Sequence, residues 1–294
     1  MEMSMSMGMS MGMSMGISVK NWIKLAVITS VASVGLAVQP NYTWADINTQ
    51  KMTIEADTAL EWRRDDRQYI ARGNANVTTP DMVLKADLIT AHYEDKDETS
   101  NNRITLVIGD GNADILHQDI HGVAEIITYN RDSDTLVLKN NNATNAIRVT
   151  RGKDVSEAED SIIYDRGNGI ITSTGNSVTK LDDGRVMRGD EAVTTLKAED
   201  NTVDHVVVTG NVYITQPTAD GGTQQATGHK AVYEAATDIV TVTGDVVLTQ
   251  GDNIIKGGKA IMRVGEGESI ITPDENTGRV SGQFLIDEDN TAKE

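Results

Sequence analysis

The sequence predicts an all-β fold in which antiparallel strands form a repeat array. Runs of alternating apolar and polar residues, rich in valine and threonine, recur along the chain, and this period of two is typical of half-buried strands. The dipeptide Gly-Asn, or a close relative, recurs every 29 to 38 residues, which indicates one supersecondary unit stacked on copies of itself. The six copies are Gly73-Asn74, Gly111-Asn112, Asn140-Asn141, Gly175-Asn176, Gly210-Asn211 and Gly244-Asp245.

The first 45 residues are predicted to be a signal peptide with a Met-rich start. Lys20 and Lys24 precede an apolar run over residues 25–38, and Ala45 supplies a small residue at a cleavage point. The run has 14 residues, whereas a membrane-spanning helix needs roughly 20. The sequence therefore favours export, and an uncleaved anchor over residues 22–38 is the alternative.

The mature chain is predicted to hold two tandem β units. The rhythm of the dipeptides breaks around residues 140–160, so we place the first unit at 46–150 and the second at 151–285. The last residues, 286–294, are predicted to be a disordered tail. A single elongated array over residues 46–285 is the alternative.

The charge of the chain excludes one class of partner. Without residues 1–45, 43 acidic and 24 basic residues remain, which gives a net charge of −19 (24 − 43). Nucleic acid is therefore not a predicted partner, because binding it requires clustered Lys and Arg side chains. The chain also has no cysteine, so burial and hydrogen bonds must hold the fold without disulfides.

The strands are predicted to run through the glycines instead of ending there. Four apolar residues on the two sides of Gly210 share one face: Val206, Val208, Val212 and Ile214. Because the apolar parity survives passage through Gly210, we expect this residue to lie within a bent strand. A bend at the same place in every unit would fold the sheet along a crease.

The copy at Gly175 departs from this pattern. Ser173 and Ser177 stand where the other copies have apolar residues, and Val178 is out of phase. We interpret the departure as a bulge or a register change at this copy.

A longer motif surrounds the dipeptide. It consists of a Gly-x-x-Ala entry, an aromatic residue, a turn and a Thr-Gly-Asn bend, and it is clearest over residues 226–246 and continues to residue 257. Weaker copies run from Leu84 to Tyr93 and from Gly122 to Leu138. With this motif the chain resembles, over nearly all of residues 46–285, the OstA-like (LptA) family of periplasmic lipopolysaccharide-transport proteins.

The resemblance implies a fold, a ligand and partners. Members of this family form an open, V-shaped β-jellyroll whose apolar interior holds the acyl chains of lipopolysaccharide. They bridge the inner and outer membranes by joining end to end and by docking on inner-membrane LptC-like and outer-membrane LptD-like proteins. Twelve residues are the predicted lipid-binding groove: Val77, Ile115, Leu136, Leu138, Val206, Val208, Val212, Ile214, Val240, Val242, Val246 and Leu248.

Two other interpretations fit the same residues. The apolar faces could pack against each other as an ordinary sandwich core, because parity alone does not distinguish a core from a groove. If residues 22–38 are retained as an anchor, the chain would be an LptC-like component of the same pathway. In the groove interpretation, the phosphates of the lipid would stay outside, since the net charge is strongly negative.

An enzyme is a further alternative that the sequence disfavours. His117 and His121 are four residues apart, which on one strand places them roughly 13 Å from each other, too far to share a metal. We expect both to be surface residues. A secreted β-repeat enzyme acting on glycans would need a marked pair of carboxylates, and no pair stands out among the acidic residues. We therefore predict no catalytic residue, no metal and no cofactor.

The two ends of the array are predicted to be exposed edge strands. The candidates are residues 51–57 at the N-terminal end and residues 278–286 at the C-terminal end. Unpaired backbone groups at such edges can accept a strand from another chain. We expect self-association end to end through these edges, and capping of the array by the terminal segments is the alternative.

Overall fold

The computed structural model describes residues 51–95, 102–141, 146–218, 221–263, 266–273 and 278–285. The predicted signal peptide and the predicted tail lie outside these residues. The described residues belong to one compact unit, Asn48–Glu294, and they form strands and turns without a helix. The all-β prediction is confirmed.

Within the described residues, eighteen strands make up a single sheet. In chain order they are β1 (Thr53–Glu55), β2 (Ala59–Arg63), β3 (Gln68–Thr78), β4 (Met82–Glu94), β5 (Arg103–His117), β6 (Ile120–Asn130), β7 (Thr135–Lys139), β8 (Ile147–Arg151), β9 (Asp154–Ala158), β10 (Ser161–Asp165), β11 (Ile170–Lys180), β12 (Val186–Leu196), β13 (Val203–Pro217), β14 (Thr223–Glu234), β15 (Ile239–Gln250), β16 (Asn253–Arg263), β17 (Glu268–Thr272) and β18 (Ser281–Gln283).

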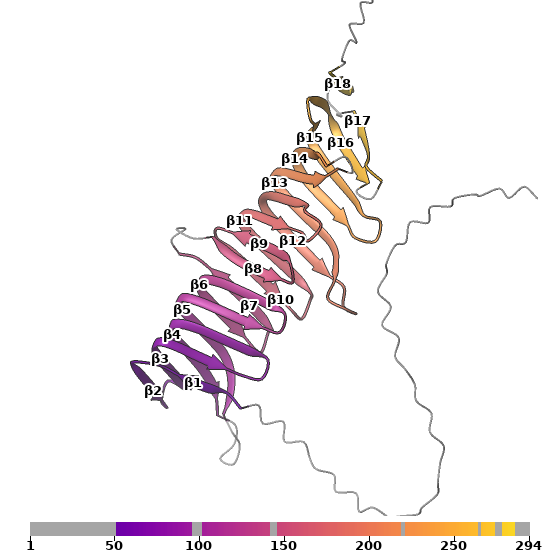
Figure 1. Cartoon of the computed structure of the whole chain (residues 1–294). Coiled ribbons are helices and arrows are strands. Elements are labelled where there is room, and N and C mark those ends of the chain that lie inside the picture. Colours follow the sequence, from indigo (N-terminus) through magenta and orange to yellow (C-terminus); the bar gives the residue numbers. More distant parts are fainter. Residues whose placement is uncertain are drawn as a thin grey trace, which may run out of the picture. The chain divides into compact units, whose positions relative to one another are not determined.

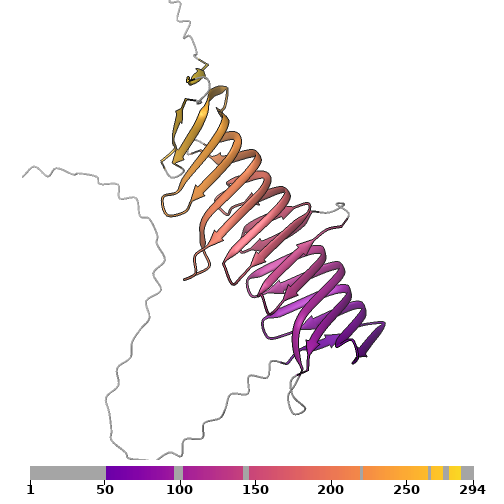
Figure 2. The same cartoon turned by 180° about the vertical axis from the view of Figure 1, so that it is seen from behind.

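All strand pairs are antiparallel, and the long strands pair with their neighbours in the chain. The strands of this unit therefore follow one another in sequence order in Figure 1, and the view from behind in Figure 2 shows the same succession. Such local connectivity is what consecutive hairpins produce. The predicted antiparallel repeat array is confirmed.

Five strands bend at a predicted dipeptide. In β3, β5, β11, β13 and β15 the glycine and the Asn or Asp after it both have positive φ, between 42° and 86°. Each dipeptide lies opposite a single residue of the next strand; Gly210 and Asn211, for example, lie opposite His229. A bulge of two residues against one bends the strand, as the sequence predicts. The copy at Asn140 differs, because β7 ends at Lys139.

The bends divide the sheet into two walls. The bulge preserves the parity of the side chains, so Val208 before the bend of β13 and Val212 after it are both buried. We call the strand segments on the two sides of the bend the first wall and the second wall. The first wall comprises residues 59–72, 88–94, 103–110, 126–139, 161–174, 191–209, 230–243, 259–263 and 268–272, and the second wall comprises residues 53–55, 75–85, 113–124, 147–158, 177–189, 212–217, 223–228, 246–257 and 281–283.

At four places in the sheet, a pair of short strands in succession occupies the position of one bent strand. β1 and β2 pair with the two halves of β3, β7 and β8 with the halves of β6, β9 and β10 with the halves of β11, and β18 and β17 with the halves of β16. The predicted boundary between residues 150 and 151 falls at the hairpin of β8 and β9, where Arg151 pairs with Asp154. Strand pairing continues across it, and the division into two units stays a prediction.

The core lies between the inner faces of the two walls. One cluster of buried apolar side chains extends from Ala71 to Leu196, and a second extends from Met187 to Met262. Each cluster contains residues from both walls, so the walls cover each other. The core is mostly aliphatic, with a few tyrosines such as Tyr93 and Tyr233 near the strand ends.

The copy at Gly175 follows the same rule as the others. The bulge predicted there is present, between Thr174 and Ser177, but every other bent strand has it too. Ser173 and Ser177 are buried on the inner face, where the copies at Gly210 and Gly244 carry valines. The polar residues therefore replace apolar ones without a change of parity.

Candidate functional site

The twelve residues of the predicted groove all lie between the two walls. None of them exposes more than 4% of its surface. Val77, Ile115, Leu136 and Leu138 belong to the first cluster, and the remaining eight belong to the second. The structure thus places every predicted residue on the inner face, in contact with other core side chains. That they line a groove for lipid stays a prediction.

Other residues of the inner face were missed from the sequence. Many are alanines, among them Ala75, Ala113, Ala226, Ala231 and Ala260, and each is fully buried. They occupy inward positions close to the bend, where the walls approach each other most closely. The period of two around each dipeptide was the signal that could have found them, but alanine gives a weak apolar pattern.

Small residues are required at the bend. A Cβ atom on Gly189 would lie 2.4 Å from Val208 Cγ1 and 2.9 Å from the carbonyl oxygen of Thr209. A Cβ atom on Gly210, whose φ is +70°, would lie 2.1 Å from Asp190 Oδ2. Side chains at these positions would push neighbouring strands apart, so the sharp bend depends on glycine.

The outer side of the bend carries a row of polar contacts. Asn74 Nδ2 donates to Asp57 over 2.7 Å, and Asn211 Nδ2 donates to Asp190 over 3.0 Å. Equivalent contacts join Asn112 to Asp87 and Asn176 to Glu159, over 2.9 and 2.8 Å. Each asparagine thereby ties its own bulge to the preceding strand, which stabilises the positive φ of the dipeptide.

Opposite the bend, the turns that end the two walls face each other across the interior. We call this side of the sheet the mouth. Arg185, in the turn between β11 and β12 of the second wall, reaches the first wall there. Its guanidinium donates to Asp238 Oδ1 over 3.0 Å and to the hydroxyl of Tyr233 over 3.3 Å, and it lies 4.6 Å from the centre of the Tyr233 ring.

Arg185 is held in the charged form despite its burial. Its side chain is 11% exposed. Burial alone would lower the pKa of the guanidinium, but hydrogen bonds to Asp183 and Tyr233 outweigh it, and the net effect raises the pKa. Arg185 Nε donates to Asp183 over 2.6 Å within the second wall, so this carboxylate fixes the direction of the side chain.

A second group at the mouth surrounds His117. This residue ends β5 in the second wall, and its Nε2 lies 3.2 Å from Nη1 of Arg166, which belongs to the first wall. The same guanidinium donates over 3.2 Å to Asp134, which also belongs to the first wall. The ring of His117 packs against Tyr129 of the first wall, with ring centres 5.7 Å apart.

The environment of His117 favours the neutral ring. Burial first, and then the charge of Arg166, lower its pKa below the ordinary value of 6.5, although Asp81 and Asp134 oppose the shift. The prediction of a surface histidine is wrong for His117, which is buried, because a turn separates it from His121 and brings it under the first wall. His121 is exposed and lies 3.2 Å from Asp114.

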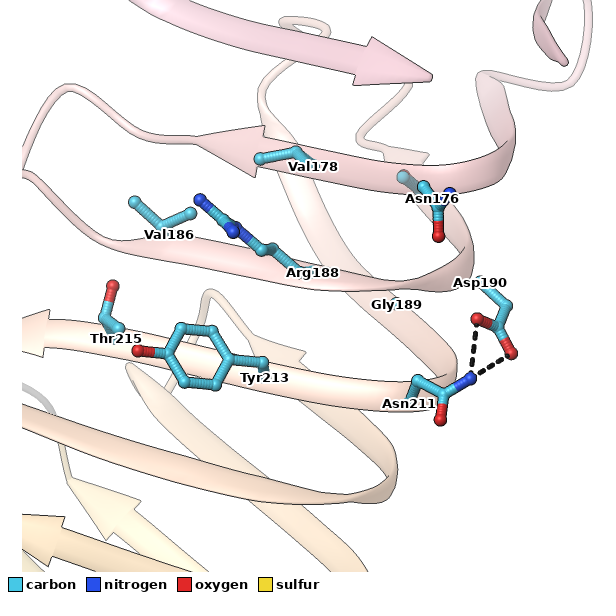
Figure 3. A pocket seen from close by; sticks show the side chains of 10 residues that line it. Asn176, Val178, Val186, Arg188, Gly189, Asp190, Asn211, Tyr213 and Thr215 are labelled. Atoms are coloured by element: carbon cyan, nitrogen blue, oxygen red, sulfur yellow. Dashed lines mark hydrogen bonds between the residues drawn. The ribbon is translucent and has the colours of Figure 1, made fainter. Parts of the chain in front are cut away.

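A hollow of about 570 Å³ lies on the outer face of the second wall. Figure 3 shows Arg188 and Tyr213 side by side in it, with the Asn211–Asp190 contact at its margin. The guanidinium of Arg188 lies 6.0 Å from the centre of the Tyr213 ring. The hollow points away from the core, and the outward parity of Tyr213 separates it from the inner face.

The two ends of the sheet expose apolar side chains. β1 and β2 pair only with β3, and β17 and β18 pair only with β16, among the described strands. Trp62 in β2 is 52% exposed, and Phe284, just after β18, is 59% exposed. The predicted edges therefore do lie at the ends of the strand order, and each presents an apolar surface.

Comparison with known proteins identifies the family. The family model described as LptA/(LptD N-terminal domain) LPS transport protein matches residues 53–170 and again residues 158–268. Together the two matches cover well over half of the 294 residues. The chain belongs to this family. The resemblance to the OstA-like (LptA) family is thus confirmed. The LptA/LptD N-terminal family acts in lipopolysaccharide transport.

No curated protein matches the chain. Among solved structures, the chain is similar to the crystal structure of LptH, the LptA homologous periplasmic component of the lipopolysaccharide transport device from Pseudomonas aeruginosa. The sequence identity is 16% and the TM-score is 0.41, and the match covers 45% of this chain and 95% of LptH.

The two matches of the LptA/LptD N-terminal family overlap over residues 158–170. This segment contains β10, which pairs with β7 on one side and with β11 on the other. One strand thus belongs to both matches, and the sheet passes from the first to the second without a gap.

None of the described residues forms a helix with the length and apolarity needed to cross a membrane. In the same part of the chain, no three His, Cys, Asp or Glu side chains are grouped closely enough to hold a metal ion.

Proposed function

We propose that the chain carries lipopolysaccharide through the periplasm with the acyl chains of the lipid between its two walls. Its family supports a role in lipopolysaccharide transport. The observation that carries the proposal is the inner face, where apolar side chains continue from Ala71 to Met262. Each CH₂ group of an acyl chain that enters such an interior gains about 0.8 kcal/mol.

The composition of the inner face suits transit better than tight binding at one place. Its apolar residues are mostly Val, Ile, Leu and Ala, which offer a similar environment along the whole array. The buried polar side chains are few: His117, Ser173, Ser177, Gln216 and Gln224. Since no single position offers a much deeper energy minimum, an acyl chain can move along the interior.

The phosphates of the lipid stay outside in this proposal. Several outward-facing cations are already paired: Arg72 with Glu61 over 2.8 Å and Arg148 with Glu157 over 2.5 Å, for example. The negative net charge of the chain also repels phosphate. Apolar burial, and not electrostatic attraction, therefore recruits the ligand.

The ends of the sheet would extend the path. We propose that copies of the chain, or inner-membrane LptC-like and outer-membrane LptD-like proteins, add strands at β1 and β2 and at β17 and β18. Backbone hydrogen bonds would supply the affinity. The exposed side chains of Trp62 and Phe284 support this, because strand addition would cover them. The interior would then continue from one protein to the next.

Site-specific crosslinking in cells tests the lipid-binding proposal. A photoreactive residue at Val212 or Val242, both on the inner face, should crosslink to lipopolysaccharide. The same residue at Thr241, next to Val242 but on the opposite face of β15, is the matched control and should not. Crosslinks from Thr241 and none from Val242 would show that the lipid binds elsewhere.

The anchored, LptC-like role is tested by a separate measurement. The two roles differ in whether residues 22–38 remain on the protein. Mass spectrometry of the chain purified from cells should find a mature N-terminus near residue 46, as expected for a periplasmic bridge. An intact N-terminus on protein in the inner-membrane fraction would favour the anchored component.

A further inference from the structure

The interior is closed at the mouth by contacts that join the two walls. At the bend the walls are joined by the chain itself, whereas at the mouth each contact that joins them in the described part of the chain is made by a side chain near the end of a wall. Two of these contacts are groups of several side chains, built around Arg166 and Arg185, whose side chains are 21% and 11% exposed.

The Arg185 group is the stronger of the two. Arg185 is oriented by Asp183 in its own wall and contacts Asp238 and Tyr233 in the other. The hydroxyl of Tyr233 also donates to Asp238 over 3.2 Å, so three side chains share one contact. Hydrogen bonds between charged groups in a partly buried place are stronger than neutral ones.

In the Arg166 group the arginine comes from the other wall. Here the arginine belongs to the first wall and contacts His117 of the second, while Asp134 holds it in place.

Two smaller contacts join the walls elsewhere. Arg151 of the second wall donates to the carbonyl oxygen of Asn201 in the first, and Ser269 of the first wall donates to Gln224 of the second over 3.1 Å. The contacts are thus spread along the mouth.

We propose that the Arg185 and Arg166 groups are latches that hold the mouth shut, and that the walls part there when the latches open. The bend, where the dipeptides have positive φ and bulges interrupt the ladder, is the hinge. Broken latches return their charged groups to water at the rim, while the inner face becomes accessible. This inference rests on the proposed function only in naming acyl chains as the ligand that enters the opened interior.

The latches can be tested without lipid, because the chain has no cysteine of its own. A single thiol introduced as Val240→Cys, next to the Arg185 group on the inner face and 1% exposed, reacts with a water-soluble alkylating reagent only when the mouth opens. In the purified full chain, Arg185→Gln should raise the alkylation rate about tenfold, as expected for the loss of a charged hydrogen bond. Arg185→Lys keeps the charge but loses the planar guanidinium, which donates to Asp238 and Tyr233 at once, and should give an intermediate alkylation rate.

Two controls separate opening from other effects. Arg188→Gln removes an arginine three residues further along the chain, in β12, but one that lies beside Tyr213 on the outer face, and should leave the rate unchanged. A thiol at Val77, in the other core cluster, reports unfolding of the whole sheet and should react no faster in the Arg185→Gln chain. Unchanged alkylation at Val240, or an equal rise at both thiols, would overturn the latch. Loss of lipid crosslinks with a normal rise at Val240 would instead count against the proposed function.

Discussion

His117 shows how a single side chain depends on contacts that are distant in the sequence. Its Nε2 accepts a hydrogen bond from Arg166, 49 positions away, and it can accept only while the ring is neutral. Asp81, Asp134 and Tyr129 also face the ring. Burial, which disfavours the charged ring, lowers the pKa of His117 first, and the charge of Arg166, whose Nη1 lies 3.2 Å from Nε2, lowers it further.

A pH dependence of stability follows from this shift. The unfolded chain takes up the proton near the ordinary pKa of 6.5 and the folded chain takes it up only at lower pH. The stability linked to the neutral ring is therefore complete above that value and is lost as the pH falls toward the folded pKa, by at most about 1.4 kcal/mol for each pH unit. Urea unfolding between about pH 7.5 and 5.5 should show this loss.

The variant His117→Asn isolates the contribution of the ring. It keeps an acceptor near Arg166 but does not titrate, so its urea midpoint should change less with pH than that of the unmodified chain. The matched control is His121→Asn, at an exposed histidine, which should preserve the slope. An equal slope in the His117→Asn chain would mean that other groups cause the pH dependence.

The position of His117 also marks what the sequence could not reveal at this scale. The alternation of Val206, Val208, Val212 and Ile214 sufficed to place all four on the inner face, because parity is a local property of a strand. The burial of His117 and the roles of Arg166 and Arg185 depend on which turns meet across the mouth. That juxtaposition arises only after the sheet has bent.

Among the elements, the bent strand determines how closely the walls approach. Predicting it required only that apolar parity continue through each glycine, and the five bulges confirm it. The prediction of a departure at Gly175 put too much weight on Ser173 and Ser177, since a strand can carry serine on its inner face on both sides of the bulge without a change of parity. The Oγ atom of Ser177 is buried and has no hydrogen-bond partner among the described residues, so this copy is less stable than one with valine.

Replacing a bend glycine tests how tightly the walls meet. In Gly189→Ala the new methyl group would meet Val208 and two carbonyl oxygens within 3.0 Å, and overpacking of this kind costs about 1–3 kcal/mol. The urea midpoint should therefore fall. The matched control is Gly167→Ala in a turn, where the nearest atom is 3.6 Å from the added Cβ and the change should be within about 0.5 kcal/mol. Equal midpoints for the two variants would show that the bend is not closely packed.

At the scale of the whole molecule, strand pairing is continuous across the predicted boundary, where the sequence left a single elongated array as the alternative to two units. The break in rhythm around residues 140–160 predicts two units, and two matches to one family model agree with a repeated unit. Yet β7 pairs with β10 and β8 pairs with β9 across that region. Spacing along the chain cannot reveal this, because short strands can replace a bent one without interrupting the ladder.

The ends of the sheet lead to a prediction about assembly. Trp62→Glu places a charge on the exposed edge strand β2, and the energy cost of burying that charge should weaken end-to-end association. Analytical ultracentrifugation should then show smaller species than for the unmodified chain. Leu116→Glu is the matched control, because Leu116 is 50% exposed but lies in β5, between two paired strands. If both variants associate alike, the edges are not the contact.

The shared bulge has a consequence for how such chains can change in length. Since each bent strand crosses from one wall to the other at the same point, an extra pair of strands fits between existing ones without altering its neighbours. Duplication of a hairpin would lengthen the molecule by a fixed step and leave both termini as they were. Size can therefore evolve here by addition, with no redesign of the parts already present.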